Sequence, residues 1–462
     1  MHNFLVFLIS LLLFGKCFTH YFFMQSLKKH FVEQLFATKC HLPNFTDHPC
    51  RRNCKRHREP LTCEYVLKVS WRTTMGRDCQ RCPSEFEDCF RHGCILGSGN
   101  QRAVAVGNQM LPGPAIEVCE GDFVVIKTMN GLVNGESLAI HFHGLHQRGT
   151  PYMDGAGLVT QCPILPMQSF AYEFEAKEAG THFWHSHMGT QRADGLAGPF
   201  IVRSRDDPND YLYDRDNLRP IMFQDWFPNE TFTNRFAKHR YGDGDRDPAL
   251  ILANGIWASP DNWYDHGDEL PKLPIEVPAY KYLLHNKMRY RFRLINNAFF
   301  DVPMRVEMEC HNLIVIASDG YPVRPVATKS LTLFNAERYD IVPYFTCNKA
   351  ERNDKAKYRL FVRGLGDAED SEQAVSWVDV IYFDKRGKRK NPRRKSLEKA
   401  CGNRCHRVYN EINYWDWTPY RMYPGNRDGL KVADLESYDK GYVQGTPDFR
   451  YLISFVSIFY CY

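Results

Sequence analysis

The sequence carries two similar stretches, Leu138-Ala139-Ile140-His141-Phe142-His143-Gly144 and Gly180-Thr181-His182-Phe183-Trp184-His185-Ser186-His187. Each one predicts a β-strand that ends in a His-x-His pair. Side chains at positions i and i+2 of a strand point to the same face, so each pair presents two imidazoles side by side. If the two strands are neighbours, all four imidazoles converge. Neutral imidazole is the commonest metal ligand and suits Cu, Zn, Fe and Ni, so a metal site is predicted.

These histidines are open to two other interpretations. A histidine on a strand is commonly solvated or hydrogen-bonded, but two His-x-His pairs within 47 residues are a rare coincidence. The spacing His141-x-His143-x-x-His146 also matches a zinc hydrolase motif of the metallo-β-lactamase type. Leu145 stands where that motif requires an aspartate, and the motif does not use a second pair. A site built from both pairs is therefore favoured.

Two nearby histidines are left out of the predicted site. The alternation of a strand turns His182 to the face opposite His185. His146 lies beyond Gly144, which ends the first strand-like run.

The composition is that of a globular protein rich in strands. Hydrophobic residues make up 44% and charged residues 24% of the 462 positions, and the formal net charge of +5 does not favour nucleic acid as a partner. The chain has 26 proline and 31 glycine residues between many short runs of Val, Ile, Phe and Tyr. These features predict an all-β fold, and the length allows two or three domains.

The first residues predict a secreted, extracellular protein. The apolar run Phe4–Phe14 is too short to span a bilayer and is typical of a signal-peptide core, so residues 1–17 are predicted to be a signal peptide. No other stretch of the sequence is long enough for a membrane span. Acceptor sequences for N-glycosylation begin at Asn44 and Asn229 and suit the same compartment.

The cysteines agree with secretion. Half of the sixteen lie within 55 residues: Cys40, Cys50, Cys54, Cys63, Cys79, Cys82, Cys89 and Cys94. In a secreted chain this density predicts disulfides that hold a segment with little core of its own, so residues 18–98 are expected to be a disulfide-rich extension. Zinc bound between Cys79 and Cys94 is the alternative. Removal of Cys17 would leave fifteen cysteines, and at least one free thiol is expected.

Longer motifs around the two histidine pairs resemble the first domain of multicopper oxidases, and within that family they are similar to insect-type, animal laccases. The motifs are His141-Phe-His-Gly-Leu-His-Gln-Arg-Gly-Thr-Pro-Tyr-Met-Asp-Gly155, Val159-Thr-Gln-Cys-Pro-Ile164, Gly180-Thr-His-Phe-Trp-His-Ser-His187 and Asp194-Gly-Leu-Ala-Gly-Pro199. The resemblance implies a copper-dependent oxidoreductase that oxidises phenols or diphenols and reduces O2 to water. It also implies a cysteine-rich extension before the first copper domain.

The resemblance assigns a role to each residue by position. It implies that His141 binds the type 2 copper, that His143 and His185 share one type 3 copper, and that His187 serves the other. These are half of the eight histidines that hold the trinuclear copper cluster of the family. Asp154 matches a family carboxylate thought to assist proton delivery during O2 reduction. Without the resemblance, Asp154 is also compatible with a simple turn residue.

The resemblance further predicts tandem cupredoxin-like β-sandwiches, two complete and a third missing. The first is expected over residues 99–205 and the second over residues 206–384. Strands are expected at Gly121–Lys127, Gly198–Val202, Pro220–Trp226, Ile251–Gly255, Tyr290–Asn297, Leu313–Gly320 and Glu337–Val342. Second domains of laccases bind no copper. Residues 385–462 are expected to form a basic loop and a connector to the third domain, and the basic run Lys385–Lys395 could instead bind a polyanion or be cleaved by a protease.

The 462 residues contain no counterpart of the third domain's copper ligands. In the family that domain supplies the type 1 copper site, with a Cys thiolate and two His, through a His-Cys-His segment. Cys-His steps occur only at Cys40, Cys310 and Cys405, none of them preceded by His, and no further His-x-His pair is present. The chain is therefore expected to be a truncated laccase-type product that does not turn over by itself.

Other functions are compatible with the same residues. The chain could be a secreted, non-catalytic copper-binding or interaction protein made of two cupredoxin domains. When complete, it could oxidise ferrous iron or ascorbate, because the specificity pocket lies partly in the third domain. Assembly with a chain that supplies the missing half-site is disfavoured, since two-domain oxidases of that kind carry a type 1 site.

Overall fold

The computed structural model describes residues 45–55, 59–132, 134–240, 250–258, 277–300, 302–347, 356–365, 375–389 and 407–412. The predicted signal peptide, Cys40, Asn44 and the connector after residue 412 lie outside the described residues. Within the described part, strands predominate and the all-β prediction is confirmed. The helices there are η1 (Phe45–Asp47), η2 (Arg77–Cys79), η3 (Phe86–Phe90), η4 (Pro151–Met153), η5 (Asp210–Leu212) and α3 (Phe232–Arg240). None of them is long and apolar enough to cross a membrane.

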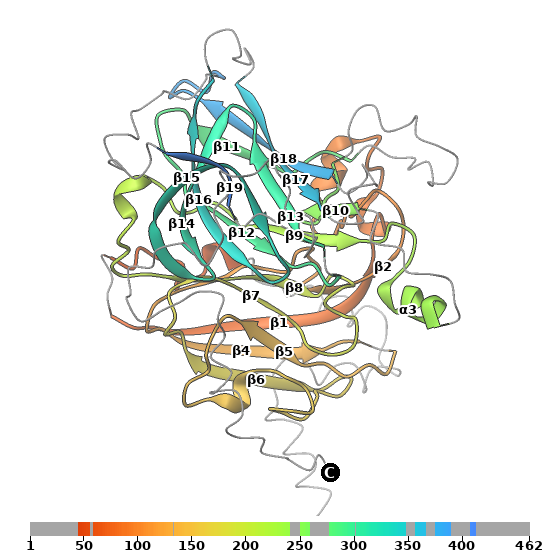
Figure 1. Ribbon diagram of the computed structural model, residues 1–462. Coiled ribbons are helices and arrows are strands. Elements are labelled where there is room, and N and C mark those ends of the chain that lie inside the picture. The colour runs from red at the N-terminus through yellow and green to blue at the C-terminus, as the bar shows by residue number, and fades with distance from the viewer. Residues whose placement is uncertain are drawn as a thin grey trace, which may run out of the picture. The chain divides into compact units, whose positions relative to one another are not determined.

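The first β-sandwich consists of two four-stranded sheets. One has the order β2 (Ala103–Gly107), β1 (Thr62–Thr73), β4 (Phe123–Asn130) and β6 (Ser169–Glu175). The other has the order β3 (Ile116–Cys119), β8 (Ala197–Arg203), β7 (Gly180–Ser186) and β5 (Ile140–His143). Figure 1 shows β1, β4, β5 and β6 below the second sandwich, with β7 and β8 between them and it.

Alternation of side chains explains how the first sandwich closes. Along β1, Tyr65, Leu67 and Val69 point inward and are buried, while the residues between them are more exposed. Ile140 and Phe142 of β5 enter the same apolar core. Because neighbouring residues of a strand point to opposite faces, the histidines of β5 lie on the other side of the sheet. The core thus orients the predicted ligands.

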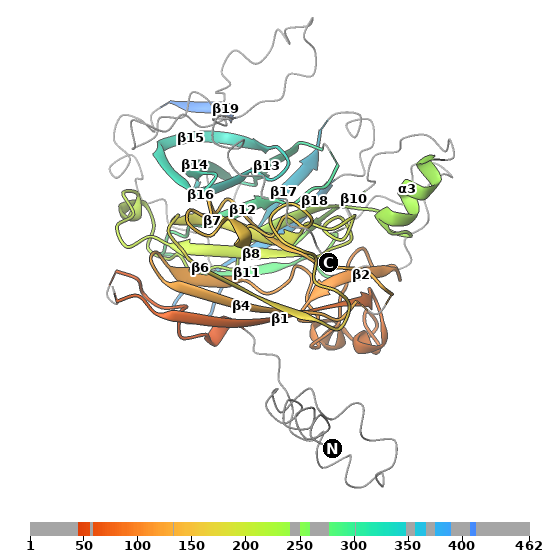
Figure 2. The ribbon, with the colours of Figure 1, turned by 90° about the horizontal axis from the view of Figure 1, so that it is seen from below.

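The second β-sandwich is built from one long, curved path of strands. Its order is β10 (Leu250–Ala253), β9 (Ile221–Trp226), β12 (Phe292–Asn296), β16 (Arg338–Phe345), β14 (His311–Ser318), β15 (Tyr321–Leu333), β13 (Met304–Met308), β17 (Lys357–Gly364), β18 (Val375–Phe383) and β11 (Lys281–His285), with β19 (Val408–Ile412) paired to β15. Figure 2 shows β19 beside β15. The strands predicted from residue 121 to residue 342 correspond to β4, β8, β9, β10, β12, β14 and β16.

Two elements bear on the domain limits, which stay a prediction. Strand β1 falls inside the range expected for the extension, yet it pairs with β2 and β4 and belongs to the first sandwich. Strand β19 falls inside the range expected for the connector, yet it pairs with β15. Both segments therefore contribute to sandwiches as well as to the connections between them.

The described cysteines are disulfide-bonded, and this confirms the prediction for those of the cysteine-rich segment. Cys79–Cys94 and Cys82–Cys89 are bonds, which excludes the alternative that these four thiolates hold zinc. The others are Cys50–Cys63, Cys54–Cys119 and Cys310–Cys347, and Cys162 is bonded too. The expected free thiol concerns cysteines outside the described residues.

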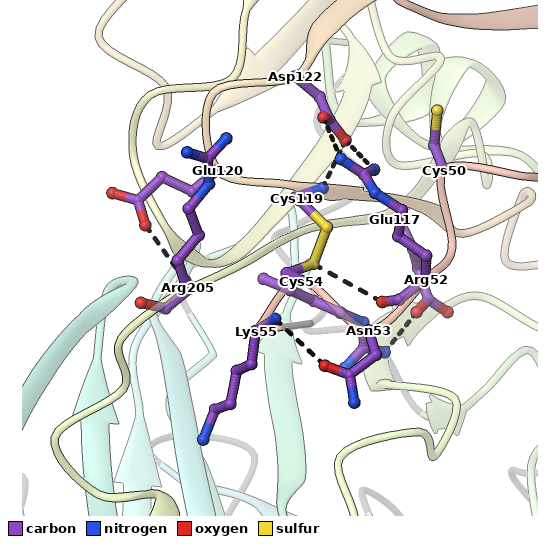
Figure 3. The surroundings of a disulfide bond; sticks show 12 residues. Cys50, Arg52, Asn53, Cys54, Lys55, Glu117, Cys119, Glu120, Asp122 and Arg205 are labelled. Carbon is purple, nitrogen blue, oxygen red and sulfur yellow. Dashed lines mark hydrogen bonds and ion pairs between the residues drawn. A yellow bond between two sulfur atoms is a disulfide. The ribbon is translucent and has the colours of Figure 1, made fainter. Parts of the chain in front are cut away.

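One disulfide lies beside a buried ion pair. Figure 3 shows Cys54–Cys119 next to Arg52 and Asp122. The Arg52 guanidinium donates to both carboxylate oxygens of Asp122, at 2.6 and 2.7 Å, and the main-chain N–H of Cys119 donates to the same carboxylate at 2.9 Å. The segment that precedes β1 is thereby held to the turn between β3 and β4.

Candidate metal centre

The two His-x-His pairs meet across neighbouring antiparallel strands, which is the condition under which the sequence predicted that the rings converge. In the register of β5 and β7, His141 lies directly opposite His185, and His143 lies opposite Phe183. His187 follows the last residue of β7, and its main-chain N–H donates to the carbonyl of Ala139 at 2.9 Å, which continues the ladder. Residues directly opposite in such a pair have their Cβ atoms about 5 Å apart. The register therefore brings imidazoles from both strands together.

The four rings form one cluster. The ring centre of His141 is 5.6 Å from that of His143, 5.2 Å from that of His185 and 5.6 Å from that of His187. His185 is 5.7 Å from His143 and 6.0 Å from His187 by the same measure. One ring nitrogen from each of His141, His143 and His185 lies within 4.8 Å of the other two, a spacing that could hold a metal ion.

Main-chain carbonyls determine which ring nitrogen of His141 and of His185 is available to a metal. Nδ1 of His185 lies 2.8 Å from the carbonyl of Ser186, and Nδ1 of His141 lies 2.6 Å from the carbonyl of Asp154. A carbonyl only accepts, so each Nδ1 carries the proton and donates, which leaves each Nε2 with a lone pair. Such fixation of the second nitrogen is usual for histidines that bind metals.

The buried end of the cluster fits a metal better than it fits an empty core. Nε2 of His185 is buried and has no hydrogen-bond partner among the described residues. A buried acceptor without a partner costs about 1–3 kcal/mol, and a bound cation would remove that cost. The donor set is entirely imidazole, which suits copper among other transition metals.

Electrostatics keep two of the rings neutral. Burial and the positive charge of Arg338 hold the pKa of His143 well below its usual value. Burial and the positive charge of Arg192 do the same to the pKa of His185. Only the neutral imidazole has a lone pair for a metal, so both rings are ready to bind near neutral pH.

The outer end of the cluster is braced by a loop. His187 is exposed, whereas the loop that follows it is anchored by Gln191. The Oγ of Ser186 donates to Oε1 of Gln191 at 2.7 Å. Nε2 of Gln191 donates in turn to Glu136 at 2.9 Å and to the carbonyl of Ser137 at 3.0 Å. The bracing fixes the chain on both sides of His187 while leaving its ring open.

Asp154 lies beside the cluster with its carboxylate half-exposed. One carboxylate oxygen is 3.5 Å from Nδ1 of His141, while the main-chain carbonyl of Asp154 accepts the Nδ1 proton. The residue that follows, Gly155, has φ of +82°. Asp154 therefore touches the ring of His141 through its backbone and places an acidic group next to it.

The two histidines left out of the predicted site have other partners. Nε2 of His182 lies 2.9 Å from the carbonyl of Glu178, and burial together with the charge of Arg338 lowers the pKa of His182 to about 3. His146 lies 3.3 Å from the carboxylate of Glu178 and 3.2 Å from the hydroxyl of Tyr321. Among the described residues, His146 is therefore not grouped with His141 and His143, as the zinc hydrolase interpretation requires.

Residues without any metal-binding character also shape the centre, and the sequence did not identify them. Phe183 is fully buried and stacks on the ring of His143, with ring centres 4.6 Å apart and planes 18° apart. Arg192 lies over Phe183 and donates to the side chain of Asn297 and to the carbonyl of Ala298 in the second sandwich. No periodicity marks these residues, because their partners are distant in the sequence.

Comparisons with known proteins agree with this geometry. Two family models, both described as multicopper oxidase, match residues 92–207 and 217–376, which together are more than half of the chain. Laccase-4 of Trametes villosa is 34% identical over 256 residues, and Laccase-2 of Fomitopsis schrenkii is 34% identical over 257 residues. These matches take in 54% of this chain and 45% and 44% of the two relatives. The chain thus spans less than half the length of the curated relatives it matches.

Solved structures are similar to the described sandwiches. The laccase from Botrytis aclada has a TM-score of 0.55 and 26% identity, covering 73% of this chain and 56% of that one. Fet3p, a multicopper oxidase that functions in iron import, has a TM-score of 0.56 over 84% of this chain and 59% of that one; its 22% identity supports the fold alone. The cupredoxin-like architecture is confirmed. The chain belongs to the multicopper oxidase family.

Proposed function

We propose that this chain forms the first two domains of a laccase-type oxidase, which oxidises phenols or diphenols and reduces O2 to water. The observation that carries the proposal is the set of converging imidazoles, with the buried Nε2 of His185 free of any other partner among the described residues. The relatives named laccase support the same class of reaction. The narrower likeness to animal laccases stays a prediction.

Copper is the cofactor that membership of the family implies. His141, His143, His185 and His187 are the proposed ligands, with the type 2 and type 3 roles given by the resemblance. Bound copper would supply the one-electron steps between a phenolic reductant and O2. The chain's own part is to hold neutral rings at fixed positions and to exclude other partners from His185.

Asp154 is the proposed proton donor beside the ligands. A carboxyl group within reach of the reacting atoms can contribute about 10²-fold or more to a proton-transfer step. Because the main-chain carbonyl of Asp154 holds the ring of His141, the side chain is free for that second task. Its carboxylate is partly exposed to solvent.

The site that would take electrons from the phenol is proposed to belong to the rest of the protein. These 462 residues contain no His-Cys-His segment, and the stretch that matches a laccase relative covers 45% of that relative's length. An extracellular location is also proposed, since each of the described cysteines is disulfide-bonded and such bonds persist in oxidising compartments.

Copper binding by the whole chain tests the site. The chain is freed of metal with a chelator and titrated with Cu(II), and bound copper is followed by electron paramagnetic resonance and by chelator competition. We expect a signal with nitrogen hyperfine structure from imidazole ligands. His141→Gln and His185→Gln should each weaken copper binding at least about 10-fold, because each removes a ligand whose replacement does not reach the metal.

Two further variants serve as controls in that experiment. His146→Gln alters a histidine that bonds to Glu178 and Tyr321, so copper binding should be unchanged. Asp154→Asn keeps the main-chain carbonyl that orients His141 and should also retain copper. Equal signals from the wild type and from both ligand variants would show that copper binds elsewhere and would refute the proposed site.

The second candidate function is that of a copper-binding protein without catalytic activity. The lack of a His-Cys-His segment favours it for these 462 residues taken alone. A turnover assay distinguishes it from the oxidase. The source transcript is sequenced beyond codon 462, and the product of its full open frame is assayed for O2 uptake with a diphenol and for the blue band of type 1 copper. Copper-dependent uptake supports the oxidase. Copper binding without uptake by that product supports the second candidate.

A further inference from the structure

The second sandwich contacts strand β7 at several residues, and its hydrogen bonds to Thr181 lie four positions before His185. The hydroxyl of Thr181 donates to Oδ1 of Asp340 at 2.6 Å and accepts from Nη1 of Arg293 at 2.6 Å. Its main-chain carbonyl accepts from Nε of Arg338 at 3.0 Å. Thr181 is 1% exposed, so these bonds are shielded from water. Three side chains of the second sandwich thus converge on one residue of the histidine-bearing strand.

The three side chains that bond to Thr181, those of Arg293, Arg338 and Asp340, have further partners in turn. Oδ2 of Asp340 accepts from Nη1 of Arg293 at 3.1 Å and also bonds to Arg291. Arg293 donates to Asp216 at 2.8 Å, and Arg338 donates to Asp319 at 3.0 Å. All three residues that bond to Thr181 are buried. Hydrogen bonds to charged partners are about twice as strong as neutral ones, so these bonds hold Thr181 firmly in place.

The same part of the second sandwich also bears on the other histidine strand. Gly144, which follows His143, has φ of +95°, and a Cβ atom there would lie 2.4 Å from Nη2 of Arg338. Phe183, which stacks on His143, packs in one buried cluster with Met222 and Ile295 of the second sandwich. Strands β12 and β16 lie against β7 in Figure 1. Both histidine-bearing strands therefore adjoin the second sandwich, which carries neither pair.

We propose that Thr181 is a positioning residue, through which the second domain determines the place of β7 and hence the distance of His185 from His141 and His143. The inference rests on the proposed role of these histidines as copper ligands. Ligand sets must be held to within about 0.5 Å of their working geometry, and a shift of β7 along β5 would exceed that. The second sandwich thereby contributes to the geometry of the proposed copper site, although it supplies none of the four histidines.

The experiment compares Thr181→Val with the wild type in the whole chain, loaded with one equivalent of Cu(II). Valine keeps the branched shape but loses the hydroxyl and its bonds to Asp340 and Arg293. We expect copper affinity to fall about 10-fold or more, the usual effect of removing a group that orients ligands. The hyperfine splitting of the Cu(II) resonance should change as well. Thr181→Ser keeps the hydroxyl and should restore both properties.

A matched control separates positioning from general stability. Thr332 is fully buried in β15, and its hydroxyl donates to Oε1 of Glu411 at 2.5 Å within the second sandwich. Thr332→Val therefore removes the same kind of hydroxyl–carboxylate bond away from β7. Both valine variants should lower the melting temperature. Only Thr181→Val should alter the copper resonance and the copper affinity.

The outcomes are distinct. An unchanged resonance and affinity in Thr181→Val, with copper bound by the wild type, would overturn the positioning role and leave the proposed copper site standing. Absence of imidazole-bound copper in the wild type would refute the proposed site and the positioning role together. If Thr181→Val does not fold, Arg338→Lys is measured instead, since it keeps the charge but lacks the Nε that bonds Thr181. Wild-type copper properties in that variant would equally overturn the inference.

Discussion

At the scale of single residues, main-chain carbonyl groups orient two of the four histidine rings. His141 and His185 each donate an Nδ1 proton to a main-chain carbonyl, that of Asp154 and that of Ser186. A carbonyl is present whatever side chain its residue carries, so orientation depends on the local path of the chain. The turn that contains Asp154 and Gly155 is therefore as important to His141 as any side chain.

Gly155 should tolerate no other residue. Its φ is +82°, and a Cβ atom would lie 1.7 Å from the carbonyl oxygen of Ile140, a main-chain atom that cannot rotate away. Gly155→Ala should lower the free energy of unfolding by about 1–2 kcal/mol for the backbone conformation and by about 1–3 kcal/mol more for the clash. Urea unfolding of Gly155→Ala and of the wild type measures this loss of stability.

Gly149→Ala is the matched control for Gly155→Ala. Gly149 has φ of +86° in the same loop region, but nothing lies within 4 Å of a Cβ placed there. It should therefore show the backbone cost alone. Equal losses of stability in the two variants would contradict the predicted clash at Ile140.

His311 should make stability depend on pH. The ring is buried in the second sandwich, where Nδ1 donates to the carbonyl of Glu309 and Nε2 accepts from the hydroxyl of Tyr382. Burial lowers its pKa from 6.5 to about 4. Between these values the unfolded chain takes up a proton and the native ring does not, so its stabilising contribution is present above pH 6.5 and is lost as the pH falls.

For His311 we predict that the difference in unfolding free energy between the wild type and His311→Gln depends on pH. At pH 7, His311→Gln should be less stable than the wild type by about 1–3 kcal/mol, because buried partners lose their bonds. As the pH falls from 6.5 to 4, the gap in the free energy of unfolding should narrow by up to about 3 kcal/mol. Urea unfolding of metal-free protein at several pH values tests this, and a constant gap would contradict it.

At the scale of elements, β7 combines two tasks on its two faces. Trp184 is fully buried in the core of the first sandwich and occupies space left by glycines, since a Cβ at Gly113 would lie 2.4 Å from its ring. Phe183 and His185 point to the opposite face. The large ring on one face fixes the strand in the sheet, and the other face carries His185, a proposed copper ligand.

The disulfide between Cys54 and Cys119 should stabilise the fold more than the disulfide between Cys82 and Cys89. The first closes a separation of 65 residues and the second a separation of 7. A longer loop removes more entropy from the unfolded chain, so replacing both cysteines by serine should cost about 4 kcal/mol in the first case and about 2 kcal/mol in the second. Guanidinium unfolding of the two double variants makes the comparison, and the reverse order would contradict this account.

At the scale of the whole molecule, the described sandwiches share an interface that is both apolar and charged. Phe183 and Ala197 of the first sandwich pack on Met222 and Ile295 of the second. Beside them, Asp216 bonds to Arg203 of the first sandwich and to Arg293 of the second. Burial opposes the charge of Asp216, but these two guanidinium groups hold its pKa well below the usual value. The histidine strands thus lie between two cores that are connected to each other.

The sequence by itself predicted the strands and the four histidines that are proposed as ligands. Alternation of apolar and polar residues is a local property, and His-x-His on a strand places two rings on one face whatever the rest of the chain does. The motifs that resemble multicopper oxidases extended this to the family, which the comparisons confirmed. The disulfides of the cysteine-rich segment were also predicted, though not their pairing.

Only the tertiary structure decided how these parts meet. The register that sets His141 opposite His185 depends on two strands that pair although η4 and β6 lie between them in the sequence. The bond from Arg338 to Thr181 joins residues 157 positions apart, and no local pattern reports such a contact. The pairing of Cys54 with Cys119 has the same character. Local sequence governs which face a side chain takes, whereas packing of distant segments governs what that side chain touches.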